Sequence, residues 1–292
     1  MATTIRQAFA DLKANLEITG LQKSTVSTRQ MNVRGVVEAD LTVLDSFLTG
    51  SYARSTMIAP LKEADVDIFV VLDPKYYTHY NGQNGGQGGL LDLVKRTLRK
   101  TYTRTPDISR NGQAVTIQFE DFVVDVVPGF HRQGGGYLIP NSITQTWLAT
   151  DPKKHVDIVS AANQTHGSNF IPLVKMLKGW NKTRGGYFRS FHLEALALQI
   201  LSNVTITDMP SGVRYFFDKA RDLVTKQNPD PAGYGDDVGK YISGDKIQEA
   251  SSRLQTAYER AIRAEDCDSR GYPRQAIEEW AKVFGDYFPA YG

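Results

Sequence analysis

Two aspartates open an apolar segment of the chain, and their spacing constrains the fold more than any other feature. Asp65 and Asp67 flank Val66, and the apolar run continues to Leu72. A run rich in β-branched and aromatic residues that ends at Asp-Pro predicts a strand. Residues i and i+2 of a strand lie on the same face. Both carboxylates should therefore point to one side of a sheet, and something on that side must compensate their charge.

A divalent cation is the compensation that these acids favour. Adjacent carboxylates repel each other unless a cation neutralises them, and hard oxygen donors without His or Cys suit Mg²⁺. A third acid, Asp125, lies in the apolar segment FVVDVVP, where a buried carboxylate needs a partner. A shared metal site would supply that partner. Three carboxylates can hold two metal ions, which we predict to be Mg²⁺ with Mn²⁺ as a substitute.

Gly50-Ser51 stands at the end of another predicted strand, residues 41–48. Glycine lets a backbone N–H approach a phosphate closely, and Ser51 adds a hydroxyl. A helix start predicted over residues 52–58 offers further N–H groups to an anion. The sequence therefore predicts that this turn binds nucleotide phosphates.

The second half of the chain adds cations and a further hydroxyl. Lys175, Lys178 and Lys182 share one face of a helix predicted over residues 169–182, and Ser190 opens the next helix. Taken singly, each feature has an ordinary explanation: a plain turn, a solvated strand edge, a solvated lysine face, a helix N-cap. Their order along the chain favours a functional site, whereas P-loop, G-x-S-x-G and HExxH motifs are all missing from the sequence.

Periodicity predicts mixed α and β structure followed by mostly helix. The first part contains predicted helices at 3–17, 25–40 and 90–102, strands at 41–48 and 66–72, a glycine-rich flexible loop at 81–89, and a hairpin of 115–119 and 122–127 that ends at Pro128-Gly129. The second contains predicted helices at 169–182, 191–204, 247–263 and 274–284. We therefore expect an α+β protein with two lobes, residues 1–150 and 151–292.

Charge and cysteine content exclude several classes of protein. A net charge of +2 argues against a general nucleic-acid coat, and the single Cys267 cannot form an internal disulfide or a zinc cluster. Apolar runs stay far below the ~20 residues that a membrane span needs. These features predict a cytoplasmic protein without a membrane partner.

The pattern Gly50-Ser51, Asp65-x-Asp67 and Asp125 resembles the nucleotidyltransferases of the DNA polymerase β superfamily. Within them, TGSYARSTMIAPLKEADVDIFVVL is similar to the bacterial CD-NTases, relatives of cyclic GMP-AMP synthase and the oligoadenylate synthases. LVKMLKGWNK resembles the family's phosphate-contacting lysine segment. RSFHLEAL resembles the segment in which a serine contacts the triphosphate and the next aromatic residue stacks on a base. The resemblance thus gives these roles to Lys178, Ser190 and Phe191.

The resemblance implies an activity. Two NTPs, with ATP one of them, bind in a cleft between the nucleotidyltransferase sheet lobe and the helical lobe, with two Mg²⁺ ions on the three aspartates. A ribose hydroxyl of one NTP attacks the α-phosphorus of the other, pyrophosphate leaves, and a second round closes a cyclic di- or trinucleotide. In bacteria such messengers act in antiphage signalling (CBASS), where the product activates a downstream effector.

Two other functions use the same residues. One is a nucleotidyltransferase that adds nucleotides to a macromolecular acceptor such as tRNA or protein. A tRNA enzyme should carry a broad basic surface, which the net charge of +2 does not favour. The other is a nucleotide-binding module without catalysis, which the three intact acids disfavour. The sequence also lacks a Cys/His zinc insertion like that of the animal DNA sensor, so activation by nucleic acid is not indicated.

Overall fold

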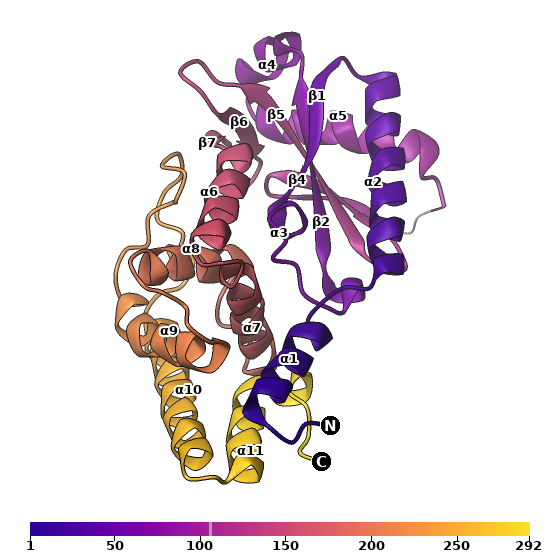
Figure 1. Ribbon diagram of the computed structural model, residues 1–292. Coiled ribbons are helices and arrows are strands. Elements are labelled where there is room, and N and C mark those ends of the chain that lie inside the picture. The colour runs from indigo at the N-terminus through magenta and orange to yellow at the C-terminus, as the bar shows by residue number, and fades with distance from the viewer. Residues whose placement is uncertain (105–106) are drawn as a thin grey trace. The chain divides into compact units, whose positions relative to one another are not determined.

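The computed structural model describes residues 1–104 and 107–292, which form two compact units (Figure 1). One unit comprises residues 18–156, and the other comprises residues 1–17 and 157–292. The assignment of functional domains to residues 1–150 and 151–292 stays a prediction. Among the described residues, no helix combines the length and apolar character that crossing a membrane requires.

The unit of residues 18–156 is built on one seven-stranded sheet. Its strands are β1 (Val43–Thr49), β2 (Asp65–Leu72), β3 (Ile108–Asn111), β4 (Ala114–Gln118), β5 (Val123–His131), β6 (Tyr137–Asn141) and β7 (Thr146–Thr150). The order is β1-β2-β5-β4-β3, with β6 paired to β5 and β7 paired to β6. β2 and β5 are parallel, and the other pairs are antiparallel. The two predicted acid-bearing strands are therefore direct neighbours.

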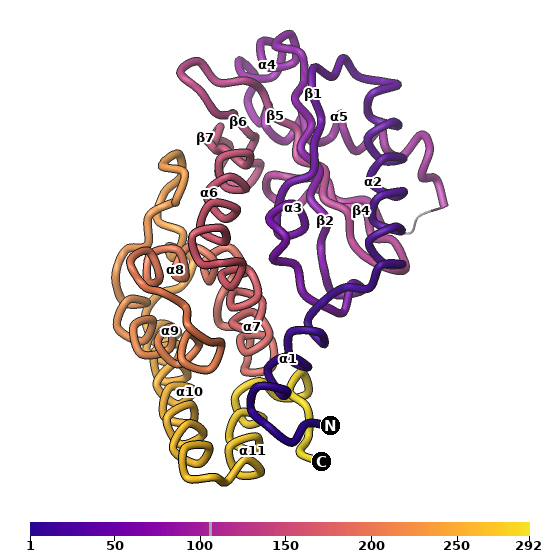
Figure 2. The backbone as a smooth tube through the Cα atoms, viewed as in Figure 1, coloured from indigo at the N-terminus to yellow at the C-terminus, as the bar shows by residue number. Residues whose placement is uncertain are grey.

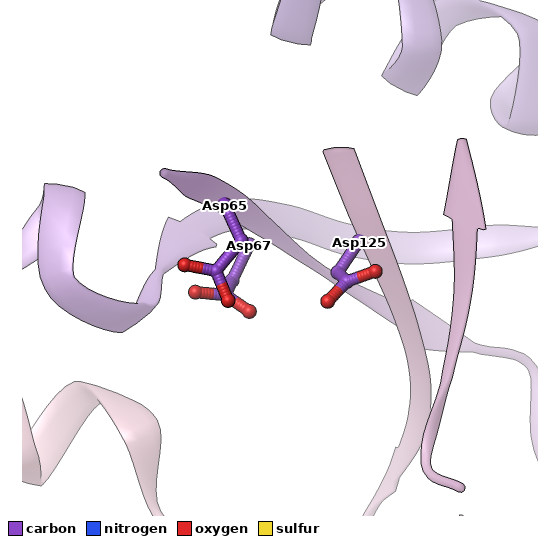
Figure 3. A group of neighbouring side chains, drawn as sticks. All are labelled: Asp65, Asp67 and Asp125. Carbon is purple, nitrogen blue, oxygen red and sulfur yellow. The ribbon is translucent and has the colours of Figure 1, made fainter. Parts of the chain in front are cut away.

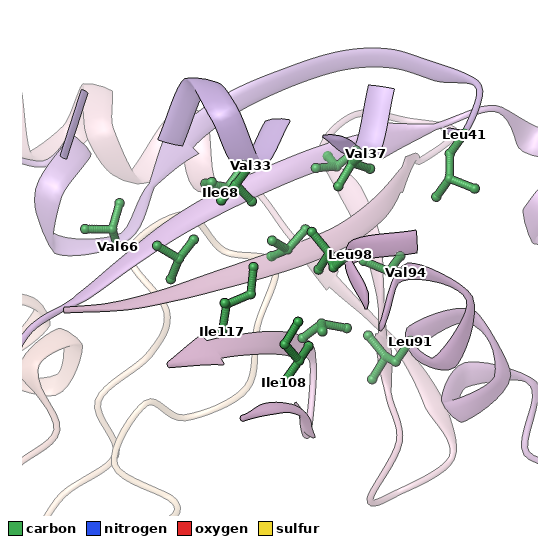
Figure 4. Packing of buried hydrophobic residues seen from close by; sticks show 14 of the residues in the cluster. Val33, Val37, Leu41, Val66, Ile68, Leu91, Val94, Leu98, Ile108 and Ile117 are labelled. Carbon is green, nitrogen blue, oxygen red and sulfur yellow. The ribbon is translucent and has the colours of Figure 1, made fainter. Parts of the chain in front are cut away.

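Two helices cover one face of this sheet. α2 (Gly20–Asp40) and α5 (Gly86–Thr101) pack their apolar sides onto the strands, and Figure 4 shows the resulting core. The core includes Val33, Val37, Val66, Ile68, Leu91, Val94, Leu98 and Ile117. Val66 and Ile68 are fully buried on this helix-covered face, so Asp65 and Asp67, which alternate with them along β2, project from the other face.

Local signals set the helix ends in this unit. α2 begins at Gly20, earlier than predicted, because Thr19 and Gln22 form a capping box: each side-chain oxygen accepts the other residue's backbone N–H, at 3.2 and 2.8 Å. The remaining short elements are α3 (Gly50–Ala53), a 3-10 turn (Leu61–Glu63) and α4 (Pro74–Asn81).

The prediction of a flexible loop over residues 81–89 was wrong for its second half. Gly86 begins α5, and the glycines there allow close packing. A Cβ on Gly86 would lie 1.8 Å from the carbonyl oxygen of Tyr80, and one on Gly89 would lie 3.0 Å from the Tyr80 ring. The glycine-rich composition predicted a flexible loop, but these glycines instead allow the end of α4 to pack closely against the start of α5.

The predicted β4–β5 hairpin is confirmed, with Val115 opposite Val126. Its predicted end at Pro128-Gly129 was wrong, because β5 continues to His131. β4 pairs with β5 up to Val126, and β6 pairs with it from Phe130 onward. Pro128 lies between these two partners on one edge of β5, while on the other edge it is opposite Val70 of β2.

The other unit is helical. Its helices are α1 (Ile5–Asn15), most of α6 (Pro152–Thr165), α7 (Phe170–Thr183), α8 (Ser190–Leu201), α9 (Met209–Leu223), α10 (Asp245–Ser269) and α11 (Pro273–Phe284), followed by a 3-10 turn (Gly285–Tyr287). α10 and α11 run side by side, and the two chain ends meet through a bridge between Ala2 and Tyr291 (Figure 2). Periodicity predicted most of these helices, but it did not predict α6 and α9, nor α4, β3, β6 and β7 of the sheet unit.

Candidate active site

The three predicted acids come together on the face of the sheet that α2 and α5 leave uncovered. Asp65 and Asp67 lie on β2, and Asp125 lies directly opposite Asp67 on the parallel strand β5. Figure 3 shows the three carboxylates pointing to the same side. One oxygen of each lies within 4.8 Å of the others. The predicted common face is confirmed, and this cluster is the donor set that a divalent cation prefers.

Crowding of like charges makes the cluster costly when it holds no cation. Burial, together with the charges of Asp65 and Asp125, raises the pKa of the Asp67 carboxyl to about 7, against the opposing effect of the Arg54 charge. Burial also raises the pKa of Asp125, which a hydrogen bond from the Thr116 hydroxyl (2.5 Å) lowers in part. A bound cation would favour the ionised forms and remove this cost.

Gly50 brings the backbone of the next turn against the acids. Its φ is +65°, a conformation that side-chain-bearing residues rarely adopt, and a Cβ there would lie 1.7 Å from Oδ2 of Asp67. Thr49, the residue before it, pairs with Asp67 across β1 and β2. Glycine is therefore required at this position both for conformation and for space.

The helix predicted over residues 52–58 was wrong beyond its first residues, because α3 ends at Ala53. Ser55 adopts a positive φ of 60°, and the N–H groups of Thr56 and Met57 both turn back to the carbonyl of Ser51. The Gly50-Ser51 turn is thus part of a compact loop that is closed by its own backbone hydrogen bonds.

An aromatic cluster supports the acid-bearing face. Phe47 on β1 pairs with Phe69 on β2, their rings stack at 5.1 Å, and the Tyr137 ring lies 4.9 Å from Phe69. Phe69 follows Asp67 by two residues, so it shares the face of the acids. The part of β2 that follows Asp67 is therefore packed on both faces of the sheet, and this packing fixes the direction in which the carboxylates project.

Lys178 lies in the helical unit and is buried. Its Nζ is 2.7 Å from Oε1 of Glu194 on α8, and the two side chains are 4% and 0% exposed. Lys175 likewise pairs with Glu17 at 2.6 Å and is 8% exposed. The alternative of a solvated lysine face is thus wrong for both residues. Sequence reasoning missed Glu194, although an acid inside the apolar run SFHLEALAL needs a partner for the same reason as Asp125.

Ser190 and Phe191 begin α8. Ser190 is exposed and Phe191 is half-buried. The alternative that Ser190 is the N-cap was wrong, because Arg189 occupies that position. His192 is buried, and burial lowers its pKa to about 4. Lys178, Ser190 and Phe191 belong to the helical unit, and the three acids belong to the sheet unit.

Comparison with known proteins identifies the family. Residues 3–163, more than half of the chain, match the SMODS family, described as Second Messenger Oligonucleotide or Dinucleotide Synthetase domain. The chain belongs to this family. It is 26% identical to a probable cyclic nucleotide synthase of Bacillus cereus (strain VD146), over 83% of this chain and 81% of the relative. It is 25% identical to the cyclic AMP-AMP-AMP synthase of an Acinetobacter species, over 98% and 86%.

Solved structures agree on the fold. The di-nucleotide cyclase DncV of Vibrio cholerae is similar with a TM-score of 0.79 at 14% identity, over 99% of this chain and 97% of that one. The predicted α+β nucleotidyltransferase fold is therefore confirmed. The SMODS chain is an enzyme, a bacterial nucleotidyltransferase of the CD-NTase type whose relatives are named as cyclic nucleotide synthases.

The Thr116 hydroxyl gives a pH-dependent prediction for the SMODS chain. Thr116→Val removes the bond that favours ionised Asp125, so the pKa of Asp125 rises. At limiting Mg²⁺, we expect the rate of product formation to fall several-fold at pH 6.5 and little at pH 8.5, which moves the acid limb of the profile upward. Thr116→Ser keeps a hydroxyl and should keep the wild-type profile. A uniform loss at every pH would contradict this account.

The buried pair of Lys178 and Glu194 gives a prediction for stability. Lys178→Met removes the ammonium group that is paired with the buried Glu194 carboxylate, so the free energy of unfolding should fall by about 3–5 kcal/mol in urea titrations. Lys178→Met combined with Glu194→Leu should recover most of that loss, because no charge remains buried. Product formation should stay low in both variants. If the double variant regains activity together with stability, Lys178 acts only as a structural partner.

Proposed function

We propose that this chain joins NTPs, with ATP one of them, into a cyclic di- or trinucleotide and releases pyrophosphate. The product would serve as a second messenger in CBASS antiphage signalling and would activate a downstream effector. The observation that carries the proposal is the carboxylate cluster of Asp65, Asp67 and Asp125 beside Gly50, in a chain of the SMODS family. We place the activity in the cytoplasm, where its NTP substrates are made.

We infer that Asp65, Asp67 and Asp125 hold two Mg²⁺ ions, for which Mn²⁺ can substitute. Two observations support the fit. The donors are carboxylate oxygens alone, which suit a hard cation, and the pKa of Asp67 is raised to about 7 by burial and by its two acidic neighbours. When bound, Mg²⁺ supplies positive charge to the triphosphate and to the hydroxyl that attacks it.

The chain's own groups then bind and orient the nucleotides. Gly50 lets the backbone of its turn approach a phosphate, and Ser51 offers a hydroxyl beside it. From the helical unit, we assign Lys178 and Ser190 to the triphosphate and Phe191 to a base, following the resemblance of their segments to the family. The functional domains would be residues 1–150 and 151–292.

The bond changes follow from the substrates. A ribose hydroxyl oxygen of one NTP forms a bond to the α-phosphorus of the other, and the bond from that phosphorus to the pyrophosphate oxygen breaks. The hydroxyl proton leaves to solvent. Repetition within the linear intermediate closes the ring, so the final product has no terminal phosphate.

A labelling experiment tests the proposal. Each of the four NTPs is supplied with an α-³²P label in turn, with Mg²⁺ and then with Mn²⁺, and the products are treated with phosphatase before chromatography and mass spectrometry. A phosphatase-resistant product with the mass of a cyclic di- or trinucleotide is expected, and it names the bases. No DNA or RNA should be required. Label that appears only on added RNA or protein would instead identify a macromolecular acceptor.

A further inference from the structure

The first turn of α8 is held by a residue far away in the sequence. In the described part of the chain, Arg189 is the N-cap of α8 but makes no side-chain cap bond. The first N–H groups of a helix need acceptors from elsewhere. The hydroxyl oxygen of Tyr241 accepts the backbone N–H of Arg189 at 2.7 Å, across 52 residues of sequence. Tyr241 therefore accepts the backbone N–H of the N-cap residue of α8, as the side chain of Gln22 does for Thr19 at the start of α2.

The same hydroxyl also contacts His192, one turn into the helix. The Tyr241 oxygen lies 3.0 Å from Nδ1 of His192. The Tyr241 oxygen accepts the N–H of Arg189, and its contact with Nδ1 of His192 is a hydrogen bond whose proton lies on either atom according to the tautomer of the imidazole. The single Tyr241 hydroxyl thus contacts both the N-cap residue Arg189 and His192 in the first turn of α8.

Further contacts hold Tyr241 in place. The Arg189 guanidinium lies 4.4 Å above the Tyr241 ring. Gly239 lies so close to His192 that a Cβ would stand 3.1 Å from Cε1 of the imidazole. Oδ1 of Asp237 accepts the N–H of Gly239 and that of Asn228, both at 2.9 Å. The irregular segment between α9 and α10 is therefore folded against the start of α8.

This arrangement suits orientation and not direct chemistry. The His192 ring is buried, with 1% of the residue exposed, so it does not reach a substrate. Ser190, in contrast, is exposed and directly follows the residue whose N–H Tyr241 holds. A small displacement of a group that contacts substrate is costly to an enzyme, even when it originates some distance away.

We propose that Tyr241 and His192 are positioning residues that fix the first turn of α8 and thereby place Ser190 for the triphosphate. The proposal rests on the function proposed above. It gives the segment between α9 and α10 a role in nucleotide binding through α8.

Tyr241→Phe is the decisive variant, because it keeps the ring and its packing and removes both hydrogen bonds. We expect the KM for ATP to rise about tenfold, with a much smaller change in kcat. Tyr187→Phe is the matched control. It removes a tyrosine hydroxyl bond of 2.5 Å to Glu249 in the same unit, but that bond does not involve α8. The control should keep the wild-type KM.

A double-mutant cycle separates positioning from general destabilisation. If Tyr241 acts through Ser190, then Tyr241→Phe should change KM less than about twofold in a Ser190→Ala background. The losses in Tm should simply add. A tenfold effect in both backgrounds, or a wild-type KM in Tyr241→Phe, would overturn the proposal.

Direct titration with ATP distinguishes this failure from a failure of the proposed function. If the wild type forms no product but binds ATP, the same cycle measured as Kd tests the role of Tyr241, while the synthase function is rejected. If the wild type neither forms product nor binds ATP, both proposals fall. If the wild type forms product and Tyr241→Phe matches it in KM and Kd, only the positioning role is rejected.

Discussion

Replacing Asp65 and Asp67 together by asparagine is expected to abolish product formation while the fold is retained. The two side chains share one face of β2 and, with Asp125 opposite, form the oxygen cluster proposed to hold Mg²⁺. Asparagine keeps the shape but removes both negative charges, so the cation and the triphosphate it neutralises lose their site. We expect a loss of at least about 10³-fold in the rate of NTP turnover, measured with α-³²P-ATP. Unchanged turnover would remove these acids from the mechanism.

The Asp67→Asn substitution alone should stabilise the metal-free protein, which distinguishes lost chemistry from lost folding. The pKa of Asp67 is about 7 when folded and 3.8 as the ordinary value, so the folded state binds the proton more tightly. The stability of the wild type should therefore fall as pH rises from about 4 to about 7. Asp67→Asn removes that loss, and the variant should be more stable by roughly 2–4 kcal/mol at pH 8 in EDTA.

Urea titrations at pH 4 and pH 8 check this sign. The difference between Asp67→Asn and wild type should be small at pH 4 and large at pH 8. Asp236→Asn is the matched control, because that carboxylate is exposed and pairs with Lys240 on the surface. It should change stability little at either pH. Equal stability of Asp67→Asn and wild type at pH 8 would show that the ionised carboxylates do not destabilise the metal-free protein.

The sequence was sufficient to predict which side chains share a face of one strand and which strands pair across a short turn. The i, i+2 spacing of Asp65 and Asp67 was enough to place both on one face, and the short turn after Phe119 was enough to pair β4 with β5. The parallel pairing of β2 with β5 was beyond local pattern, because it joins segments with α4, α5 and two strands between them. Asp125 was nevertheless predicted to belong to the site, because a carboxylate in an apolar segment needs a partner when it is buried.

Other features depend on tertiary packing that has no local signature. Nothing in the sequence around Tyr241 indicates that its hydroxyl caps α8. The segment 86–89 is glycine-rich like a loop, but it forms the start of α5, where Gly86 and Gly89 pack against Tyr80. Glu194 is the exception, because the rule used for Asp125 would have predicted a buried partner, and Lys178 lies 16 residues before it.

Gly50→Ala should have the second largest effect on activity, because one methyl group would occupy the position of an Asp67 oxygen that is proposed to bind Mg²⁺. The Cβ would lie 1.7 Å from Oδ2 of Asp67, and the backbone φ of +65° is already unfavourable for alanine. Either the Asp67 carboxylate or the turn must move. A shift of about 1 Å at a reacting centre costs roughly 100-fold in rate, and we expect at least that loss. The free energy of unfolding should also fall by about 2 kcal/mol or more.

Gly35→Ala is the matched control for that substitution. Gly35 lies within α2, and a Cβ there meets nothing within 4 Å. Alanine should therefore keep full activity and stabilise the helix by about 0.5–1 kcal/mol. A second comparison isolates the clash: in an Asp67→Ala background, Gly50→Ala should cost only the backbone strain, about 1–2 kcal/mol, because the oxygen it would strike is gone. If the cost is the same in both backgrounds, the strain at φ +65° and not the contact with Asp67 explains why glycine is needed at position 50.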